Sequence, residues 1–196
     1  MLQREKLYFI LGALFIVIVI LSNLTGGKLV ASPFGGVVSA SQFLYPFTFF
    51  LGDLLTEVYG GQRARYVVYL GFAMAVIVHF LALFLIAIPL SFGAKADYQS
   101  ALETLFSFNG FSLASSLLAY LVSQLIDVKT YLWFKKKTDG RLIWLRTNVS
   151  TISSQLIDSF IISLILFYGF LGWPFQEAMK IFGATLVLKT VFSLFL

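Results

Sequence analysis

Residues 111–137, FSLASSLLAYLVSQLIDVKTYLWFKKK, contain the features that decide the fold of this chain. The apolar part, 111–134, is about as long as the roughly 20 residues that an α-helix needs to cross some 30 Å of hydrocarbon. Within it, Gln124 and Asp127 are three residues apart, so they share one face of a helix. The three lysines that follow are typical of the cytoplasmic end of a membrane span. The stretch therefore predicts a transmembrane helix with one polar face.

The rest of the chain repeats this pattern. Hydrophobic residues make up 59% of the 196 residues and charged residues only 12%, about half of the charged share of an ordinary soluble domain. The sequence predicts an all-α polytopic membrane protein with a single transmembrane domain over 1–196. The second of its six spans is the weakest because two acids interrupt it, so five spans remain an alternative. The predicted spans are 7–24, 42–58, 66–90, 111–134, 150–171 and 174–196.

Basic residues fall in alternate connections, which gives the orientation. They occupy the N-terminus and the connections after the second and fourth spans, so these segments and both termini are predicted to be cytoplasmic. We expect a multi-pass protein of the bacterial inner membrane, with 25–40 as a flexible external loop or hairpin and 91–110 as a longer external loop. The basic residues are Arg4, Lys6, Arg63, Arg65, Lys135, Lys136, Lys137, Arg141 and Arg146.

Several function classes find no support in the sequence. The chain has no cysteine, which excludes disulfides, thiolate nucleophiles and cysteine metal sites. It also lacks HExxH, GxSxG, Walker and metal-spaced motifs, so we expect no enzyme activity, no metal and no cofactor. Topology explains the net charge of +5 better than nucleic-acid binding does. The expected partners are the lipid bilayer and a small solute, and homo-oligomerisation stays open.

Acidic side chains interrupt the predicted spans. The sequence SQLID at 123–127 recurs at 154–158, so Gln155 and Asp158 repeat the pairing of Gln124 with Asp127. Asp53 and Glu57 are four residues apart and also share a helical face. A charge near the bilayer centre costs at least about 2.5–3.5 kcal/mol, so these acids are expected to face inward.

The depths of the acids locate the predicted site. Asp53, Asp127 and Asp158 are expected at one depth, about 8–14 Å from the cytoplasmic ends of their helices. This predicts a cytoplasm-proximal cavity whose carboxylates and amides bind a polar solute with many hydrogen-bond donors. The alternative is a structural polar core in which the acids satisfy one another and cations such as Arg65 or Arg146.

Other polar residues extend this prediction. A cluster before the fifth span is expected to close the cavity from the cytoplasmic side. Lys189 either pairs with one of the acids or reaches the cytoplasmic surface. His79 is expected to be a packing residue rather than a proton relay. The cluster before the fifth span comprises Arg141, Trp144, Arg146, Asn148, Ser150 and Thr151.

Two ordered groups of residues carry a family resemblance. The first is Tyr45-Pro46-Phe47-Thr48, Asp53, Thr56-Glu57-Val58-Tyr59-Gly60 and Ala64-Arg65; the second is Gln124-Leu125-Ile126-Asp127-Val128, Lys135 to Lys137, Trp144-Leu145-Arg146, Ser150-Thr151 and Ser154-Gln155-Leu156-Ile157-Asp158. Together they resemble the signatures of the queuosine-precursor transporter family, also called the vitamin uptake transporter family. The resemblance covers roughly 42–165. The chain ends at Leu196 without a polar segment after the last span, unlike the usual family ending.

The resemblance implies an inner-membrane importer of 7-deazaguanine bases or queuine, salvaged for transfer RNA modification. A deazaguanine edge offers two adjacent donors that one carboxylate accepts, while its carbonyl requires an amide or an arginine. Asp127 and Asp158, with Gln124 and Gln155, are the expected base site, and Asp53 and Glu57 line it or gate it. An aromatic residue such as Tyr45 stacks on the ring. The expected substrate-binding set is Asp53, Glu57, Gln124, Asp127, Gln155, Asp158, Arg146, Asn148, Trp144 and Phe47, with Arg65 and Lys189 as charge partners or gate.

Three functions remain open at this point. The first is a secondary importer that works by facilitated diffusion or by coupling to protons through one of the acids. The second is a substrate-binding component that needs a separate energising complex, to which the family is similar in topology. The third is a membrane scaffold protein, in which the acids would serve stability or partner capture.

Overall fold

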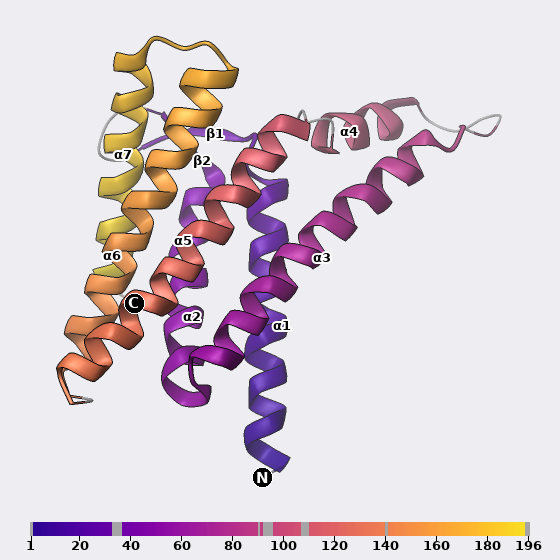
Figure 1. The fold of residues 1–196 in the computed structure, drawn as a ribbon. Coiled ribbons are helices and arrows are strands. Elements are labelled where there is room, and N and C mark those ends of the chain that lie inside the picture. Colours follow the sequence, from indigo (N-terminus) through magenta and orange to yellow (C-terminus); the bar gives the residue numbers. More distant parts are fainter. Residues whose placement is uncertain are drawn as a thin grey trace.

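A computed structural model describes residues 2–32, 37–89, 91, 96–106, 110–139 and 141–194 of the chain. This part is helical apart from one short β-hairpin (Figure 1). Its elements are α1 (Leu2–Leu24), β1 (Leu29–Ala31), β2 (Val37–Ser39), the 3₁₀-helix η1 (Ala40–Phe43), α2 (Tyr45–Tyr59), α3 (Gly61–Ala87), α4 (Ala96–Phe106), α5 (Gly110–Lys137), α6 (Ile143–Ile161), the π-helix η2 (Ile162–Phe170) and α7 (Phe175–Leu194).

Each of the six predicted spans contains a helix of the structure. Three helices in the described part are long and apolar enough to cross a membrane, namely Gln3–Leu24, Gly61–Ala87 and Ile143–Phe170. The helix in the second predicted span, α2, has 15 residues and is about 22 Å long, which is shorter than the hydrocarbon layer. The structure is therefore that of a helical membrane protein. Residue 90 and residues 195–196, which end two predicted spans, lie outside the described residues.

In the segment 25–40, where the sequence predicted a loop or a hairpin, β1 and β2 pair antiparallel with Val30 opposite Val38 and form a hairpin. One connection and one boundary differ from the sequence prediction. The segment 91–110, predicted to be a loop, contains α4, a short polar helix that leaves no long apolar run in the sequence. Its first turn carries Asp97, which favours a helix start. The fifth span was predicted to begin at 150, but α6 begins at Ile143.

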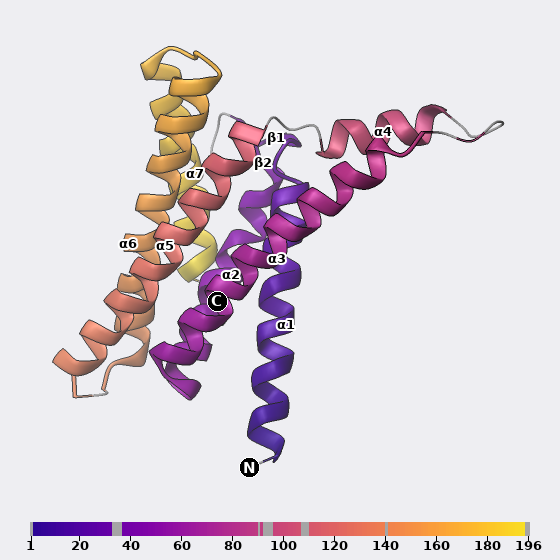
Figure 2. The ribbon, with the colours of Figure 1, turned by 45° about the vertical axis from the view of Figure 1, so that its right-hand side comes forward.

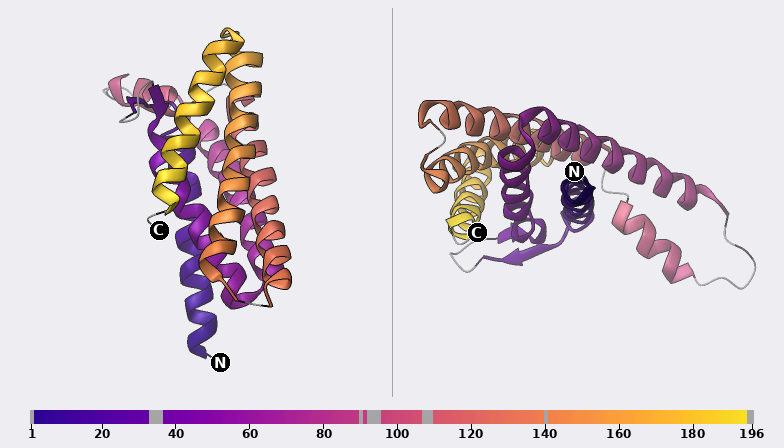
Figure 3. Two further views of the ribbon diagram at one scale, coloured as in Figure 1. Left: turned by 90° about the vertical axis from the view of Figure 1, so that its left-hand side faces the viewer. Right: turned by 90° about the horizontal axis from the view of Figure 1, so that it is seen from below.

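The long helices form two layers. Seen from below, α3 and α5 make up one layer and α1, α2 and α7 the other, while α6 packs against both α5 and α7 (Figure 3). Figure 2 shows α5 and α6 running side by side over most of their length. Between α2 and α3 the chain reverses at Gly60, whose φ of 84° suits glycine. The polar interior lies where α2, α5, α6 and α7 meet.

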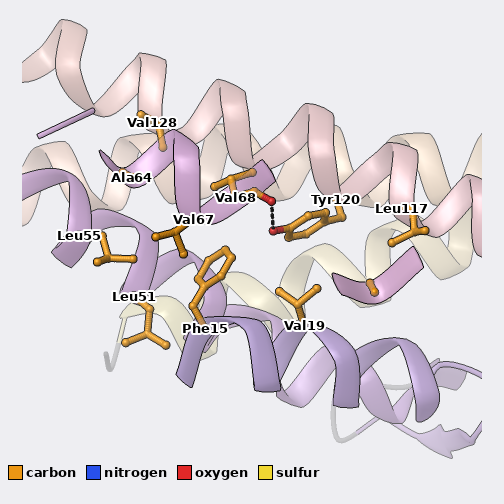
Figure 4. Packing of buried hydrophobic residues seen from close by; sticks show 11 residues of the cluster. Phe15, Val19, Leu51, Leu55, Ala64, Val67, Val68, Leu117, Tyr120 and Val128 are labelled. Carbon is orange, nitrogen blue, oxygen red and sulfur yellow. Dashed lines mark hydrogen bonds between the residues drawn. The ribbon is translucent and has the colours of Figure 1, made fainter. Parts of the chain in front are cut away.

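An apolar core holds α1, α2, α3 and α5 together beside that polar interior. Phe15 is fully buried within this core, and its ring centre lies 6.3 Å from that of Tyr120 on α5 (Figure 4). The Tyr120 hydroxyl donates to the Val68 carbonyl across 3.0 Å, which joins α5 to α3. This buried core fixes the positions of α2 and α5, which carry the polar residues of the site.

The N-terminus, the α2–α3 junction and the α5–α6 connection lie at the lower end of the molecule in Figure 1. The hairpin and the η2–α7 connection lie at the upper end. Contacts at the lower end tie α1 to the next two helices: Arg63 forms an ion pair with Glu5 at 2.8 Å, and the Tyr59 hydroxyl donates to the Arg4 carbonyl. The three basic segments of the sequence thus share one end.

Candidate substrate-binding site

Polar side chains occupy three levels along the interior between α2, α5, α6 and α7. We call them the lower, middle and upper levels, following Figure 1. The sequence analysis placed three carboxylates at one depth, and this is wrong, because Asp158 lies about one helical turn above the other two. The cause is the early start of α6, which puts Asp158 fifteen residues from Ile143, about 22 Å along the helix.

The lower level is an ion-pair network around Glu57. Its carboxylate accepts from Lys135 Nζ at 2.8 Å and from the Tyr131 hydroxyl at 3.0 Å. Arg146 Nη2 lies 2.8 Å from the other oxygen of Glu57, and its guanidinium lies 5.2 Å from the centre of the Tyr131 ring. Arg146 is completely buried. Two cations around one carboxylate make this level a structural clamp between α2, α5 and α6.

The middle level contains Asp53 and Asp127, both buried. Asp53 accepts from the hydroxyls of Ser150 and Thr151, each at 3.3 Å. Asp127 Oδ1 accepts from the Ser154 hydroxyl at 2.8 Å. The two carboxyl groups are close enough to interact with each other electrostatically. The middle level therefore combines two acids and three hydroxyls.

The upper level pairs Asp158 with Lys189. Lys189 Nζ lies 2.6 Å from Asp158 Oδ2, and both side chains are buried. The ammonium group also lies 4.7 Å from the centre of the Tyr45 ring, a favourable cation–π distance. Ser123 donates to the other carboxylate oxygen at 3.4 Å. The sequence analysis left the role of Lys189 open, and the structure shows it paired with an acid.

The repeated SQLID sequence explains how α5 and α6 join. Ser123 on α5 donates to Asp158 on α6, and Ser154 on α6 donates to Asp127 on α5. The serine of each copy therefore binds the aspartate of the other copy. This reciprocal contact arises because the two helices run antiparallel and present the same four-residue spacing to each other.

A cavity of about 330 Å³ opens above the upper level. Its floor includes Asp158 and Tyr45, and its walls come from α1, η1, α3, α5, η2 and α7. Aromatic wall residues include Phe167 and Trp173, and Gln42 and Asn23 add amide groups. Ser159 at the end of α6, with Ser163 and Phe167 of η2, lines the same side of the cavity at intervals of four residues.

The predicted site residues divide between this cavity and the levels beneath it. Asp158 lines the cavity, whereas Gln124, Asp127, Asp53 and Glu57 lie below it within the described residues. Gln124 Nε2 donates to the Thr48 hydroxyl at 3.0 Å. This cavity faces the end opposite the basic segments, whereas the sequence analysis expected the site near the basic end.

The remaining predicted residues lie farther from the cavity. Trp144 is 68% exposed and Phe47 38% exposed. Asn148 donates to the Trp144 carbonyl, and Arg65 donates its Nε to the Gly61 carbonyl of its own helix. Gln155 is completely buried, and neither of its amide atoms has a hydrogen-bond partner among the described residues. The cluster expected to close the cavity lies at the lower end, where all of it except Arg141 belongs to the first turns of α6.

The sequence analysis missed several cavity residues. Gln42, Asn23, Ser41 and Thr185 line the cavity, but they are single residues or small groups of polar residues near or within apolar runs. The residues of the lower and middle levels were recognisable in the sequence because they form polar pairs three or four residues apart on one helix. The cavity residues come from many different elements and have no such spacing, so only the folded arrangement identifies them.

A helical membrane protein with an interior cavity and a buried carboxylate has the arrangement of a membrane transporter. The chain belongs to the family described as "Putative vitamin uptake transporter", whose model matches residues 39–196. The family resemblance drawn from the sequence is thereby confirmed. Because this is a family of transporters, the chain is a transporter and not an enzyme.

Two curated relatives support this assignment. A protein of Bacillus subtilis (strain 168) named "Probable queuosine precursor transporter" is 36% identical over 163 residues, which are 82% of this chain and 69% of the relative. A protein of Escherichia coli (strain K12) named "Queuosine precursor transporter" is 26% identical over 168 residues, which are 85% of this chain and 71% of the relative. No solved structure matches the chain significantly.

Proposed function

We propose that this chain is an importer of the bacterial inner membrane and that its substrate is a queuosine precursor, either a 7-deazaguanine base or queuine. The names of its relatives support the substrate class. The observation that carries the proposal is the buried carboxylate of Asp158 in the floor of the cavity. The cavity volume of about 330 Å³ lies within the range of small-molecule sites, about 300–1,000 Å³.

In this proposal the base enters the cavity with its donor edge toward Asp158. The ring N–H and the exocyclic amine donate to the carboxylate. Gln42, whose Oε1 has no hydrogen-bond partner within the described residues, supplies an amide for the remaining polar groups of the base. The rings of Tyr45, Phe167 and Trp173 provide flat apolar surfaces for the heterocycle.

The pairing of Asp158 with Lys189 suggests a preference among the precursors. Asp158 is the only acidic residue of the cavity lining in the described part, and Lys189 already balances its charge. A 7-aminomethyl substituent adds a cation, for which this cavity offers no further carboxylate. We therefore expect the uncharged 7-cyano base to bind more tightly than the aminomethyl base.

We also propose six membrane spans with both termini in the cytoplasm. The positive-inside rule supports this orientation, because the three basic segments lie together at the lower end in Figure 1. Exposed apolar side chains such as Phe9, Phe80 and Phe84 support a lipid-facing outer surface. With this orientation the cavity opens toward the periplasm, where an importer collects its substrate.

Thermal unfolding of the purified protein with each base tests the proposal directly. A ligand at 100 times its Kd stabilises the folded state by about 2.7 kcal/mol. We expect a clear rise in Tm with the 7-cyano base, a smaller rise with the aminomethyl base and queuine, and none with adenine. The Asp158→Asn variant should lose the shift, whereas Glu177→Gln, which changes an exposed acid outside the site, should retain it.

Uptake by proteoliposomes that contain only this chain tests the transport step. We expect entry of labelled 7-cyano base, with little entry through the Asp158→Asn variant. Equal stabilisation by adenine and the deazaguanine bases would contradict the proposed substrate. Binding without uptake in liposomes would contradict an importer that works without an energising complex.

A further inference from the structure

The middle level contains two acids for which the described part of the chain supplies no counter-ion. The carboxyl groups of Asp53 and Asp127 are close enough to interact, and their hydrogen bonds come from neutral hydroxyls on the same stretch of α6. Two adjacent carboxylates cannot both remain charged at low cost when they are removed from water. The level therefore needs one additional positive charge.

Unpartnered oxygen atoms lie beside this pair. Asp127 Oδ2 and Gln124 Oε1 have no hydrogen-bond donor among the described residues, and both side chains are fully buried. Both point toward α2 at Gly52, where a β-carbon would lie 3.2 Å from Gln124 Oε1 and 3.8 Å from Asp127 Oδ2. The absence of a side chain at Gly52 leaves room for these oxygens. Acceptors without donors indicate a missing hydrogen.

The charged groups around the pair form ion pairs with other groups, although Nε and Nη1 of Arg146 have no hydrogen-bond partner among the described residues. On α2, Glu57 is bound by Lys135 and Arg146 in the lower level. On α6 and α7, Asp158 and Lys189 neutralise each other in the upper level. The hydroxyls of four nearby tyrosines have other partners: Tyr45 with Ser116, Tyr59 with Arg4, Tyr120 with Val68 and Tyr131 with Glu57. The Tyr8 hydroxyl of α1 donates to the Arg63 carbonyl, and Arg63 of α3 forms an ion pair with Glu5. Also on α3, Arg65 donates to the Gly61 carbonyl and His79 lines the cavity. On α5, Lys129 is exposed.

We propose that Asp53 and Asp127 share one proton and form the proton-binding site that couples import to the proton gradient. This inference rests on the proposed function, because it assigns the driving ion of the same transporter. The site is separate from the base cavity, since the middle level lies below Asp158. A shared proton supplies the missing charge and one hydrogen bond between the two carboxyl groups.

The α5–α6 contacts connect the proton site to the cavity. Ser154 binds Asp127 and lies one turn from Asp158 on α6, while Ser123 binds Asp158 and lies one turn from Asp127 on α5. A displacement of α6 against α5 on base binding therefore changes the surroundings of both acids. In the import cycle, one proton enters the pair from the periplasmic side and leaves to the cytoplasm, and the base moves in the same direction.

Proteoliposomes test the coupling. With wild-type protein, an inward proton gradient should accumulate labelled base several-fold above its equilibrium level. Asp53→Asn and Asp127→Asn should abolish this accumulation but still exchange internal for external base, because neither residue lines the cavity. Glu177→Gln, a matched acid-to-amide change at an exposed position, should accumulate base like wild type.

The results that overturn the inference differ from those that overturn the proposed function. Exchange of base without stimulation by a proton gradient rejects coupling but leaves the transporter intact. Stimulation by a sodium gradient alone rejects the proton in favour of a metal cation. No binding and no exchange in wild type reject the proposed function itself.

Infrared spectroscopy tests the proton without any transported base. At neutral pH, the wild-type protein should show the carbonyl stretch of a protonated carboxyl group. Asp127→Asn and Asp53→Asn should each remove it, whereas Asp158→Asn should leave it unchanged. Absence of the band in folded wild-type protein overturns the shared proton, even where a variant fails to fold.

Discussion

Lys189 shows how strongly a single buried residue depends on its partner. It is fully buried, and its ammonium group contacts Asp158 and the Tyr45 ring. Removal of one member of a buried ion pair commonly costs about 3–5 kcal/mol, because the other charge stays buried without compensation. We therefore expect Lys189→Met to lower the free energy of unfolding by that amount, as measured by denaturation in detergent.

Two variants separate this effect from a general loss of packing. The double variant Asp158→Asn/Lys189→Met removes both charges, so it should regain much of the stability while still lacking base binding. Lys180→Met breaks an exposed pair with Glu177 and should change stability little. Equal losses in the single and double variants would show that the charge of Asp158 is not the cause.

At the residue scale, the sequence predicted which acids are buried but not their partners. The insertion cost of a charge is enough to place Asp53, Asp127 and Asp158 inside. It does not determine that Asp158 meets Lys189 while Asp127 meets Ser154. Those choices depend on the relative heights of α5, α6 and α7, which are set by helix boundaries that a hydropathy pattern locates only within several residues.

At the scale of helix pairs, Gly71 allows α3 to approach α5 closely. A β-carbon at this position would lie 2.7 Å from the Tyr120 hydroxyl oxygen and 3.4 Å from the Phe15 ring. Gly71→Ala should therefore cost about 1–3 kcal/mol by overpacking. Thermal unfolding should show a lower Tm for this variant.

Gly183→Ala is the matched control for Gly71→Ala. No atom lies within 4 Å of the corresponding β-carbon position, and alanine favours a helix over glycine by about 1 kcal/mol. Its Tm should be unchanged or slightly raised. A similar loss in both variants would point to helix flexibility rather than to the close α3–α5 contact.

The reciprocal serine–aspartate contacts predict that the neighbouring serines Ser154 and Ser153 contribute differently to stability. Ser154→Ala leaves Asp127 without its 2.8 Å donor, and loss of a hydrogen bond to a charged or shared carboxyl group costs about 1.5–3 kcal/mol. Ser153→Ala on the same helix removes only a bond to the Val149 carbonyl, so its effect should be smaller. Guanidinium or urea titration of the two variants measures the difference.

At the element scale, the long apolar helices were the predictable part of the fold. The sequence analysis missed α4 because a short polar helix has no apolar run, and it missed the early start of α6 because Arg146 and Asn148 are polar although both are buried. It also gave no sign of the π-helix η2. In a uniformly apolar segment, α-helical hydrogen bonds between residues four apart and π-helical bonds between residues five apart are compatible with the same composition, so the sequence does not distinguish them.

At the scale of the whole molecule, the proposed orientation can be tested by cysteine labelling, since the chain has no cysteine of its own. Asp139→Cys, in the α5–α6 connection, should react with a membrane-impermeant maleimide only in inverted vesicles. Lys28→Cys, beside the hairpin, should react in intact spheroplasts. Labelling of both positions from the same side would contradict the six-span topology.

The position of Lys189 has a consequence for biosynthesis. Asp158 is in α6, which the ribosome makes before α7, so the carboxylate enters the membrane before its counter-ion has been synthesised. Thr185 and Ile181 of α7 also belong to the cavity wall. The nascent chain therefore contains no completed cavity until its last described helix docks, and a chain that stops before Lys189 exposes an uncompensated acid to the quality-control proteases of the membrane.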